Sequence, residues 1–142
     1  MSLRKTTKNF ASNGVKTLLN LEITVEKGKL PRLPFLKLKN KILGKKYNLS
    51  IVFTDNKTTK KLNRIYRKKN KPANVLSFPL SKNKGEIFLS IKEAEKSKKL
   101  FNKKGAELIG FFLIHAMLHL KGLAHGSTME HMEEKFSRYF GI

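Results

Sequence analysis

The apolar stretch 106–120, AELIGFFLIHAMLHL, limits the possible folds of this chain more than any other feature. Its apolar residues would surround a helix almost completely, so such a helix must be buried on nearly all sides. It is shorter than the roughly 20 apolar residues that a membrane-spanning helix needs. It also contains Glu107, His115 and His119, and ionisable side chains are rare in membrane spans. The stretch is therefore expected to be the central buried helix of a globular fold.

The elements expected around this helix follow from hydrophobic periodicity and from turn residues. Strands are expected at 21–26, 48–55, 73–80 and 86–90, and helices at 33–43, 58–69, 91–101 and 131–140. Pro79 cannot donate a hydrogen bond to a sheet ladder, so the strand that contains it is expected at an edge. This order predicts an α+β fold with a small mixed sheet of about four strands, one of them an antiparallel edge strand, packed with helices.

Three of the four histidines of the chain lie close together in the segment HAMLHLKGLAH. His115 and His119 are four residues apart, a spacing that places two side chains on one face of a helix. Gly122 can adopt the left-handed conformation that ends a helix, so the chain can turn back and bring His125 to the same point. Three imidazoles around one ion leave a fourth position open, as catalytic zinc sites do. The segment predicts a transition-metal site with His115, His119 and His125 as ligands, zinc being the best candidate, while His131 is expected on the surface.

The spacing of these histidines is that of the metzincin zinc proteases, HExxHxxGxxH, with one decisive difference. Those enzymes carry a glutamate that acts as general base, and this chain has Ala116 at that position. A methyl group cannot accept a proton, so peptidase activity by that mechanism is not expected. A bound ion could still act on a phosphoryl oxygen or on water.

The charge of the chain points to an anionic partner. The chain has 31 Lys plus Arg against 10 Asp plus Glu, a net charge of +21. Such a protein is attracted to polyanions, of which nucleic acid is the commonest. The chain has no cysteine, which excludes disulfides and thiolate metal sites. Its N-terminal stretch has no apolar run of the kind that a secretory signal needs.

Two separated segments resemble the YbeY family of bacterial metal-dependent RNA-processing proteins. LNRIYRKKNKPANVLSFP at 62–79 is similar to the family stretch LNxxYRxKxKPTNVLSFP, and HAMLHLKGLAH at 115–125 is similar to its metal motif HGxLHLxGYDH. The resemblance runs from about residue 20 to the end. It implies one domain over 1–142, with the first 15 to 20 residues as a flexible tail. It also implies an α+β fold with a zinc ion in a cleft bordered by the edge strand.

The resemblance further implies a single-strand-specific endoribonuclease that matures the 3′ end of small-subunit (16S) ribosomal RNA and takes part in ribosome quality control. Such a protein works in the cytoplasm with ribosomal RNA and the ribosome, with ribosome-assembly proteins as further candidate partners and without a membrane. His115, His119 and His125 would be the ligands, and Arg67 would be the catalytic arginine. A guanidinium binds phosphate through two donors and suits that role. The basic residues around it are candidates for a track along the RNA backbone, namely Arg64, Lys68, Lys69 and Lys71.

The chain departs from the family pattern in front of the third histidine. Leu123 and Ala124 stand where the family has Tyr-Asp, and Ala73 replaces a threonine. If that aspartate orients a ligand, metal affinity or rate will differ here. An alternative is therefore a non-catalytic, basic ribosome-assembly factor whose metal site is structural. A metallohydrolase acting on something other than RNA is a further alternative, which the charge disfavours.

Overall fold

The structure, a computed structural model, describes residues 14–142. The tail expected for the first 15 to 20 residues falls mostly on residues 1–13, which lie outside the described residues. Within the described part, Val15–Leu18 is not a tail but a strand, β1. It forms a hairpin with the next strand, and Asn20 makes the turn with a positive φ of 56°.

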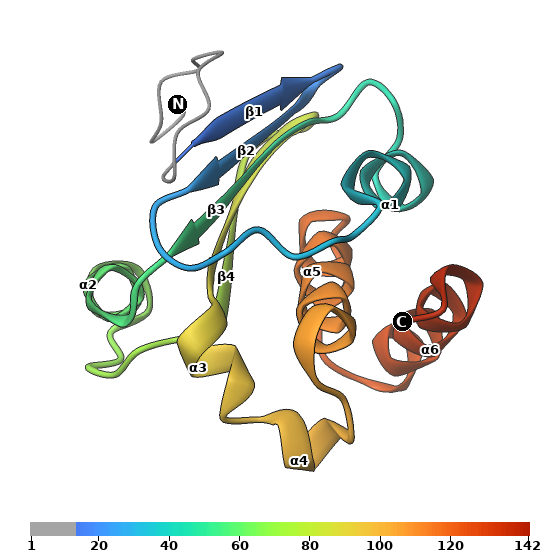
Figure 1. Ribbon diagram of the computed structural model, residues 1–142. Coiled ribbons are helices and arrows are strands. Elements are labelled where there is room, and N and C mark those ends of the chain that lie inside the picture. The colour runs from blue at the N-terminus through green and yellow to red at the C-terminus, as the bar shows by residue number, and fades with distance from the viewer. Residues whose placement is uncertain (1–13) are drawn as a thin grey trace.

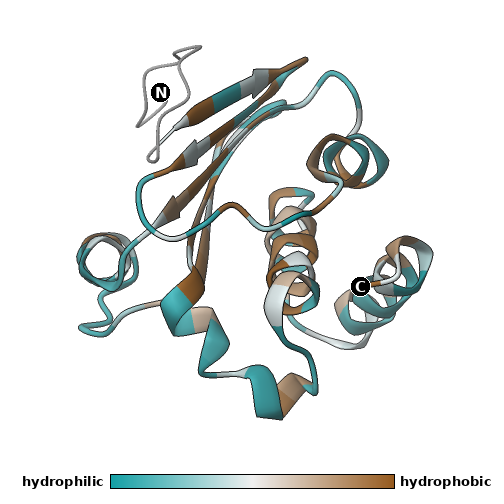
Figure 2. Cartoon of the chain, in the orientation of Figure 1, coloured by the Kyte–Doolittle hydropathy of each residue, from teal (hydrophilic) through white to brown (hydrophobic). Residues whose placement is uncertain are grey.

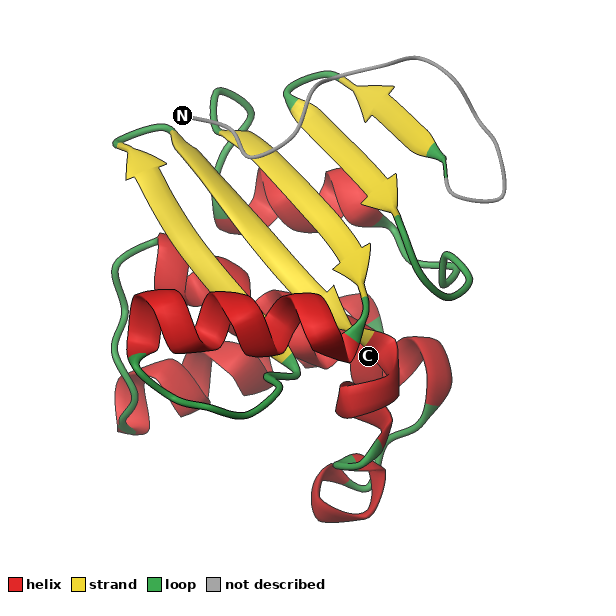
Figure 3. Cartoon of the chain, turned by 90° about the vertical axis from the view of Figure 1, so that its left-hand side faces the viewer, coloured by secondary structure: helices red, strands yellow, loops and turns green. Residues whose placement is uncertain are grey.

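A five-stranded mixed sheet forms the framework of the molecule (Figure 3). Its strands are β1, β2 (Leu21–Val25), β3 (Asn48–Thr54), β4 (Val75–Ser81) and β5 (Lys84–Ser90), in the spatial order β1-β2-β3-β5-β4. The three central strands are parallel, and each edge strand pairs antiparallel with its neighbour. The α+β fold and the edge position of the proline-containing strand are confirmed. The sheet has five strands rather than about four, because β1 adds a second antiparallel edge.

Residues 14–142 include six helices. They are α1 (Phe35–Ile42), α2 (Asn56–Arg67), α3 (Ile91–Glu95), α4 (Lys98–Phe101), α5 (Gly105–Leu120) and α6 (Ser127–Phe140). Helices α1 and α5 lie on one face of the sheet, with α6 packed outside α5, and α2 lies on the other face (Figure 1). The helix expected at 91–101 is two short helices, since the chain leaves helical geometry at Ser97. Across residues 14–142, no helix is long and apolar enough to cross a membrane.

Helix α5 is the buried centre of the core, as its composition predicts (Figure 2). It packs between the sheet and α6, and Leu108, Leu113 and Ile114 are completely buried. The facing side of the sheet supplies apolar residues at alternate positions, which is the pattern of a strand with one face on the core. These include Leu21, Ile23, Leu49, Ile51, Phe53, Ile87 and Leu89.

Helix α2 carries Arg67 at its last position. The Asp55 side chain caps its N-terminus, with its Oδ1 accepting a hydrogen bond from the Thr58 N–H at 2.8 Å. The helix ends where Lys68 takes a left-handed conformation. Its buried positions are Thr59 and Asn63, whereas Ile65 and Tyr66 lie on the exposed side.

Candidate metal centre

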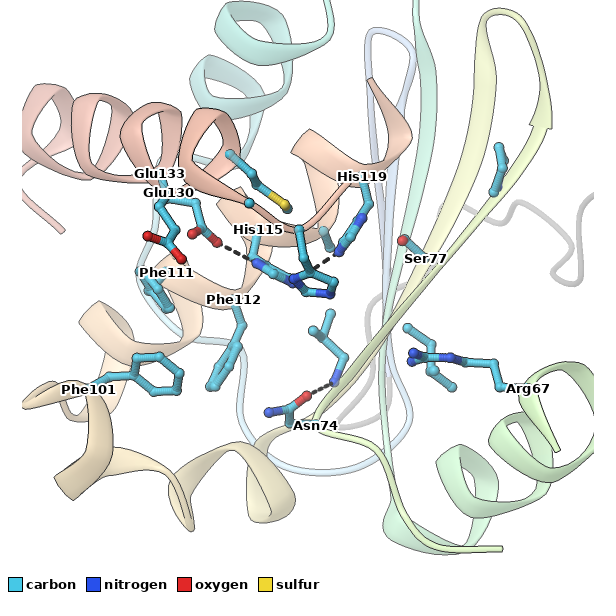
Figure 4. Close-up of a pocket in the computed structure, with 17 residues that line it drawn as sticks. Arg67, Asn74, Ser77, Phe101, Phe111, Phe112, His115, His119, Glu130 and Glu133 are labelled. Atoms are coloured by element: carbon cyan, nitrogen blue, oxygen red, sulfur yellow. Dashed lines mark hydrogen bonds and ion pairs between the residues drawn. The ribbon is translucent and has the colours of Figure 1, made fainter. Parts of the chain in front are cut away.

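The fold brings His115, His119 and His125 together at the C-terminal end of α5. His115 and His119 lie one turn apart on the helix, and Gly122, with φ of 105°, turns the chain so that His125 returns to them. The ring centroids of the three pairs are 4.6, 5.2 and 4.8 Å apart. One nitrogen from each ring lies within 4.8 Å of the others (Figure 4). The local turn predicted from glycine therefore assembles the cluster.

The outer nitrogens of two of these rings are held by hydrogen bonds. Nδ1 of His115 donates to the Glu133 carboxylate of α6, and Nδ1 of His119 donates to the Leu123 carbonyl at 3.1 Å. Both Nε2 atoms are thereby turned inward, and they lie 3.1 Å apart. Two nitrogens bound tetrahedrally to zinc at about 2.0–2.1 Å lie about 3.3 Å from each other. The donor set and its spacing therefore fit a zinc-like ion, and Glu133 and Leu123 are the partners that would orient two of its ligands.

The surroundings of His119 favour the neutral imidazole that a metal requires. Burial lowers the pKa of His119 below its usual value of 6.5, and the nearby His115 and His125 lower it further. The Leu123 carbonyl and the Glu133 carboxylate oppose this shift. The neutral form of His119 therefore persists below the pH at which a free histidine would take up a proton.

The histidines line a cleft of about 920 Å³ between α5 and the edge strand β4. Asn74 and Ser77 of the β4 segment border it, and the Asn74 side chain accepts a hydrogen bond from the Val75 N–H at 2.7 Å. Ala116, at the position of the metzincin glutamate, also lines the cleft. The cleft is large enough for a nucleotide-sized group.

Arg67 lies in the lining of the same cleft, although 48 residues separate it from His115 in the sequence. It reaches the cleft from α2, across β4 from the histidines (Figure 4). The four residues of the expected basic track are exposed and do not line the cleft. They are Arg64, Lys68, Lys69 and Lys71. His131 is exposed on α6, as expected.

Three phenylalanines line the cleft on the side away from Arg67 (Figure 4). Phe101, from the last position of α4, has its ring centroid 5.0 Å from that of Phe111 and 5.5 Å from that of Phe112. The cleft therefore has a cationic side chain at one end, imidazoles at its centre, and phenylalanines beside the carboxylates of Glu130 and Glu133 at the other end.

Sequence reasoning did not identify Glu133 or the phenylalanines as part of the site. Glu133 follows Met129 by four residues and precedes Phe136 by three, so it lies on the buried face of α6. An acidic residue at an apolar-face position needs a buried partner. That pattern was the signal available in the sequence.

Comparisons with known proteins give matches over most of the chain. Residues 22–140 match the family model described as Endoribonuclease YbeY. The chain is similar to the Endoribonuclease YbeY of Pelagibacter ubique, with 39% identity over 101 residues that cover 66% of this chain and 66% of that one. The Mesoplasma florum protein of the same name is 35% identical over 113 residues, which cover 72% of this chain and 64% of that one. The Buchnera aphidicola protein, also named Endoribonuclease YbeY, is 36% identical over 135 residues, which cover 83% of this chain and 87% of that one. The chain thus spans just under two thirds of the first two relatives.

A solved structure supports the architecture independently. The solution structure of a Thermotoga maritima protein superposes with a TM-score of 0.56, at 23% identity, and covers 85% of this chain and 89% of that chain. At this identity the likeness concerns the fold alone.

Proposed function

Because this chain belongs to the Endoribonuclease YbeY family, we propose that it is a metal-dependent endoribonuclease that cuts single-stranded RNA. One observation carries the proposal: three histidines spaced for a metal and an arginine from a distant helix line the same cleft. The net charge of +21 supports a polyanionic substrate. The cleft has the size and chemistry for a phosphodiester between the histidines and Arg67.

In this proposal each residue of the cleft has a separate task. His115, His119 and His125 would hold one divalent ion, with zinc the best fit to an all-imidazole site. When bound, that ion would supply Lewis-acid chemistry at a phosphodiester. The Arg67 guanidinium binds a non-bridging phosphate oxygen and neutralises charge that develops there. Glu133 and the Leu123 carbonyl keep the histidine rings turned inward, so the departure from Tyr-Asp at 123–124 leaves His119 with an acceptor from the backbone.

For the biological substrate, we propose small-subunit ribosomal RNA, with maturation of its 3′ end and ribosome quality control as the setting, in the cytoplasm and on the ribosome. The family membership and the basic charge support this proposal. Arg64, Lys68, Lys69 and Lys71 form an exposed basic surface next to Arg67 that suits a phosphate backbone outside the cleft.

The test is cleavage of a single-stranded ribosomal RNA fragment by highly purified protein. Wild type is compared with His119→Ala, Arg67→Ala and, as a matched histidine control outside the cleft, His131→Ala. We expect wild type and His131→Ala to cut, and the other two variants to be strongly impaired. Equal cutting by all four would identify a contaminant and reject the enzyme. Strong, salt-sensitive RNA binding without cutting would favour the non-catalytic assembly factor.

A further inference from the structure

Phe101 is an exposed aromatic residue at the mouth of the cleft. Phe101 is 36% exposed and also lines the cleft. The rings of Phe111 and Phe112, both from α5, lie behind it, and all three ring pairs are within 5.9 Å. The Phe101 ring is thus held in place by Phe111 and Phe112, and part of it stays accessible.

The segment that carries Phe101 is strongly basic. It reads KSKKLFNKK, and Lys98, Lys99 and Lys104 are exposed on both sides of the ring in sequence. Lys103 is engaged with the Ile142 carbonyl at 2.9 Å, with its ammonium 5.9 Å from the Phe111 ring centroid. An aromatic ring within a lysine-rich segment is the combination that single-strand-binding proteins use.

The position of Phe101 relative to the histidines indicates which way a bound RNA strand would run along the cleft. The histidine cluster lies between Arg67 and the phenylalanines (Figure 4), and residues of all three groups line the same cleft. An RNA strand whose phosphate lies between Arg67 and the histidines would therefore place a neighbouring nucleotide toward Phe101.

We propose that Phe101 is a stacking platform for a nucleobase of single-stranded RNA, with Phe111 and Phe112 as its rigid support and Lys98, Lys99 and Lys104 as contacts to the adjacent phosphates. The inference rests on the proposed function, because it takes RNA as the substrate. Every base has a π-face, so the platform selects unpaired strands without selecting a sequence. The base pairs of a duplex keep their faces stacked on each other, so a duplex gains nothing from Phe101.

The experiment measures binding of a single-stranded RNA oligonucleotide and of the same oligonucleotide with abasic sites, which keeps the phosphates and removes the bases. Metal-loaded wild type, Phe101→Ala and Phe101→Trp are titrated with both at low temperature, and gels restrict the measurement to times before the proposed cleavage shortens the RNA. We expect Phe101→Ala to bind the intact strand about 5- to 100-fold more weakly, with affinity for the abasic strand unchanged. Phe101→Trp should restore wild-type binding.

Leu100→Ala is the matched control, since Leu100 is the neighbouring apolar residue and is 79% exposed outside the cleft lining. It should bind both strands as wild type does. Equal losses of Phe101→Ala on the intact and abasic strands would overturn the platform, as would binding of wild type to neither strand. Because the readout is binding, a wild type that discriminates bases but does not cut would reject the nuclease and keep the platform.

Discussion

The Glu133 carboxylate of α6 accepts a hydrogen bond from Nδ1 of His115 on α5, which joins the last helix to the metal centre. A carboxylate behind an imidazole fixes the tautomer and increases the basicity of the inward nitrogen. Glu133→Ala should therefore lower metal affinity about 10- to 100-fold, and Glu133→Gln should lower it less, because an amide oxygen still accepts. Competition with a chromophoric chelator measures both.

Glu134→Gln is the control for this prediction. Glu134 is the next residue on α6, and it is exposed and paired with Arg138 at 2.6 Å. Its loss should leave metal affinity at the wild-type level. If Glu133→Ala also binds metal as wild type does, the carboxylate has no part in holding the site.

Acidification should release the metal, and at a lower pH than it would from a site of histidines with ordinary pKa values. Ligating imidazoles must be neutral, so proton uptake competes with the ion. Since burial and the neighbouring rings lower the pKa of His119 below 6.5, the neutral form of His119 is the majority at pH 6.5 and becomes the minority only at lower pH. Metal content measured after equilibration at stepwise lower pH should hold at pH 6.5 and fall below it. Complete release above pH 6.5 would contradict the assignment of His119.

Arg67→Ala should slow RNA cleavage about 100-fold or more, as loss of a group that stabilises developing charge does. Metal content should not change, since Arg67 is not among the possible ligands. Arg67→Lys should recover part of the rate, because an ammonium supplies charge without the two-donor geometry. Arg32→Ala is the matched control and should cut at nearly the wild-type rate, because Arg32 is exposed and lies outside both the cleft lining and the basic surface around Arg67. Metal loss in Arg67→Ala would instead indicate a structural role.

Asp55→Ala should destabilise the fold by about 1 kcal/mol, because it removes the side-chain cap of α2. Asp55→Asn should cost little, since its amide oxygen can accept the same hydrogen bond. The Thr58 hydrogen bonds hold the pKa of Asp55 below its ordinary value of 3.8. The ionised cap therefore stabilises the fold fully above pH 3.8, and this contribution is lost as pH falls through the lowered pKa. Urea unfolding at two pH values measures it, and identical acid sensitivity of wild type and Asp55→Asn would contradict this account.

The parts of the structure that follow from short-range rules could be predicted from the sequence. The histidine cluster needs only helical spacing and one glycine turn. The strand β1 was missed because VKTL is four residues long and has only one partner strand. Helix α2 packs through Leu62 and also through the buried Thr59 and Asn63, whose polar side chains donate hydrogen bonds to backbone carbonyls, so hydrophobicity alone does not identify its buried face.

The remaining features of the site depend on tertiary packing. Glu133 meets His115 only because α6 folds back on α5, and no periodicity in either segment encodes that contact. Phe101 reaches the cleft because the expected helix at 91–101 breaks at Ser97. Arg67 was assigned through its motif, and its place in the cleft comes from α2 packing behind β4.

Two of the three histidines belong to α5, whereas His125 belongs to the loop that leads into α6. An ion held by all three would thus fix this loop to the helix. Local opening of the loop would then depend on the supply of metal. Under metal scarcity we expect faster amide hydrogen exchange and earlier proteolytic nicking at 121–126, while the sheet keeps its protection. The availability of metal in the cell would then set the lifetime of the protein as well as its activity.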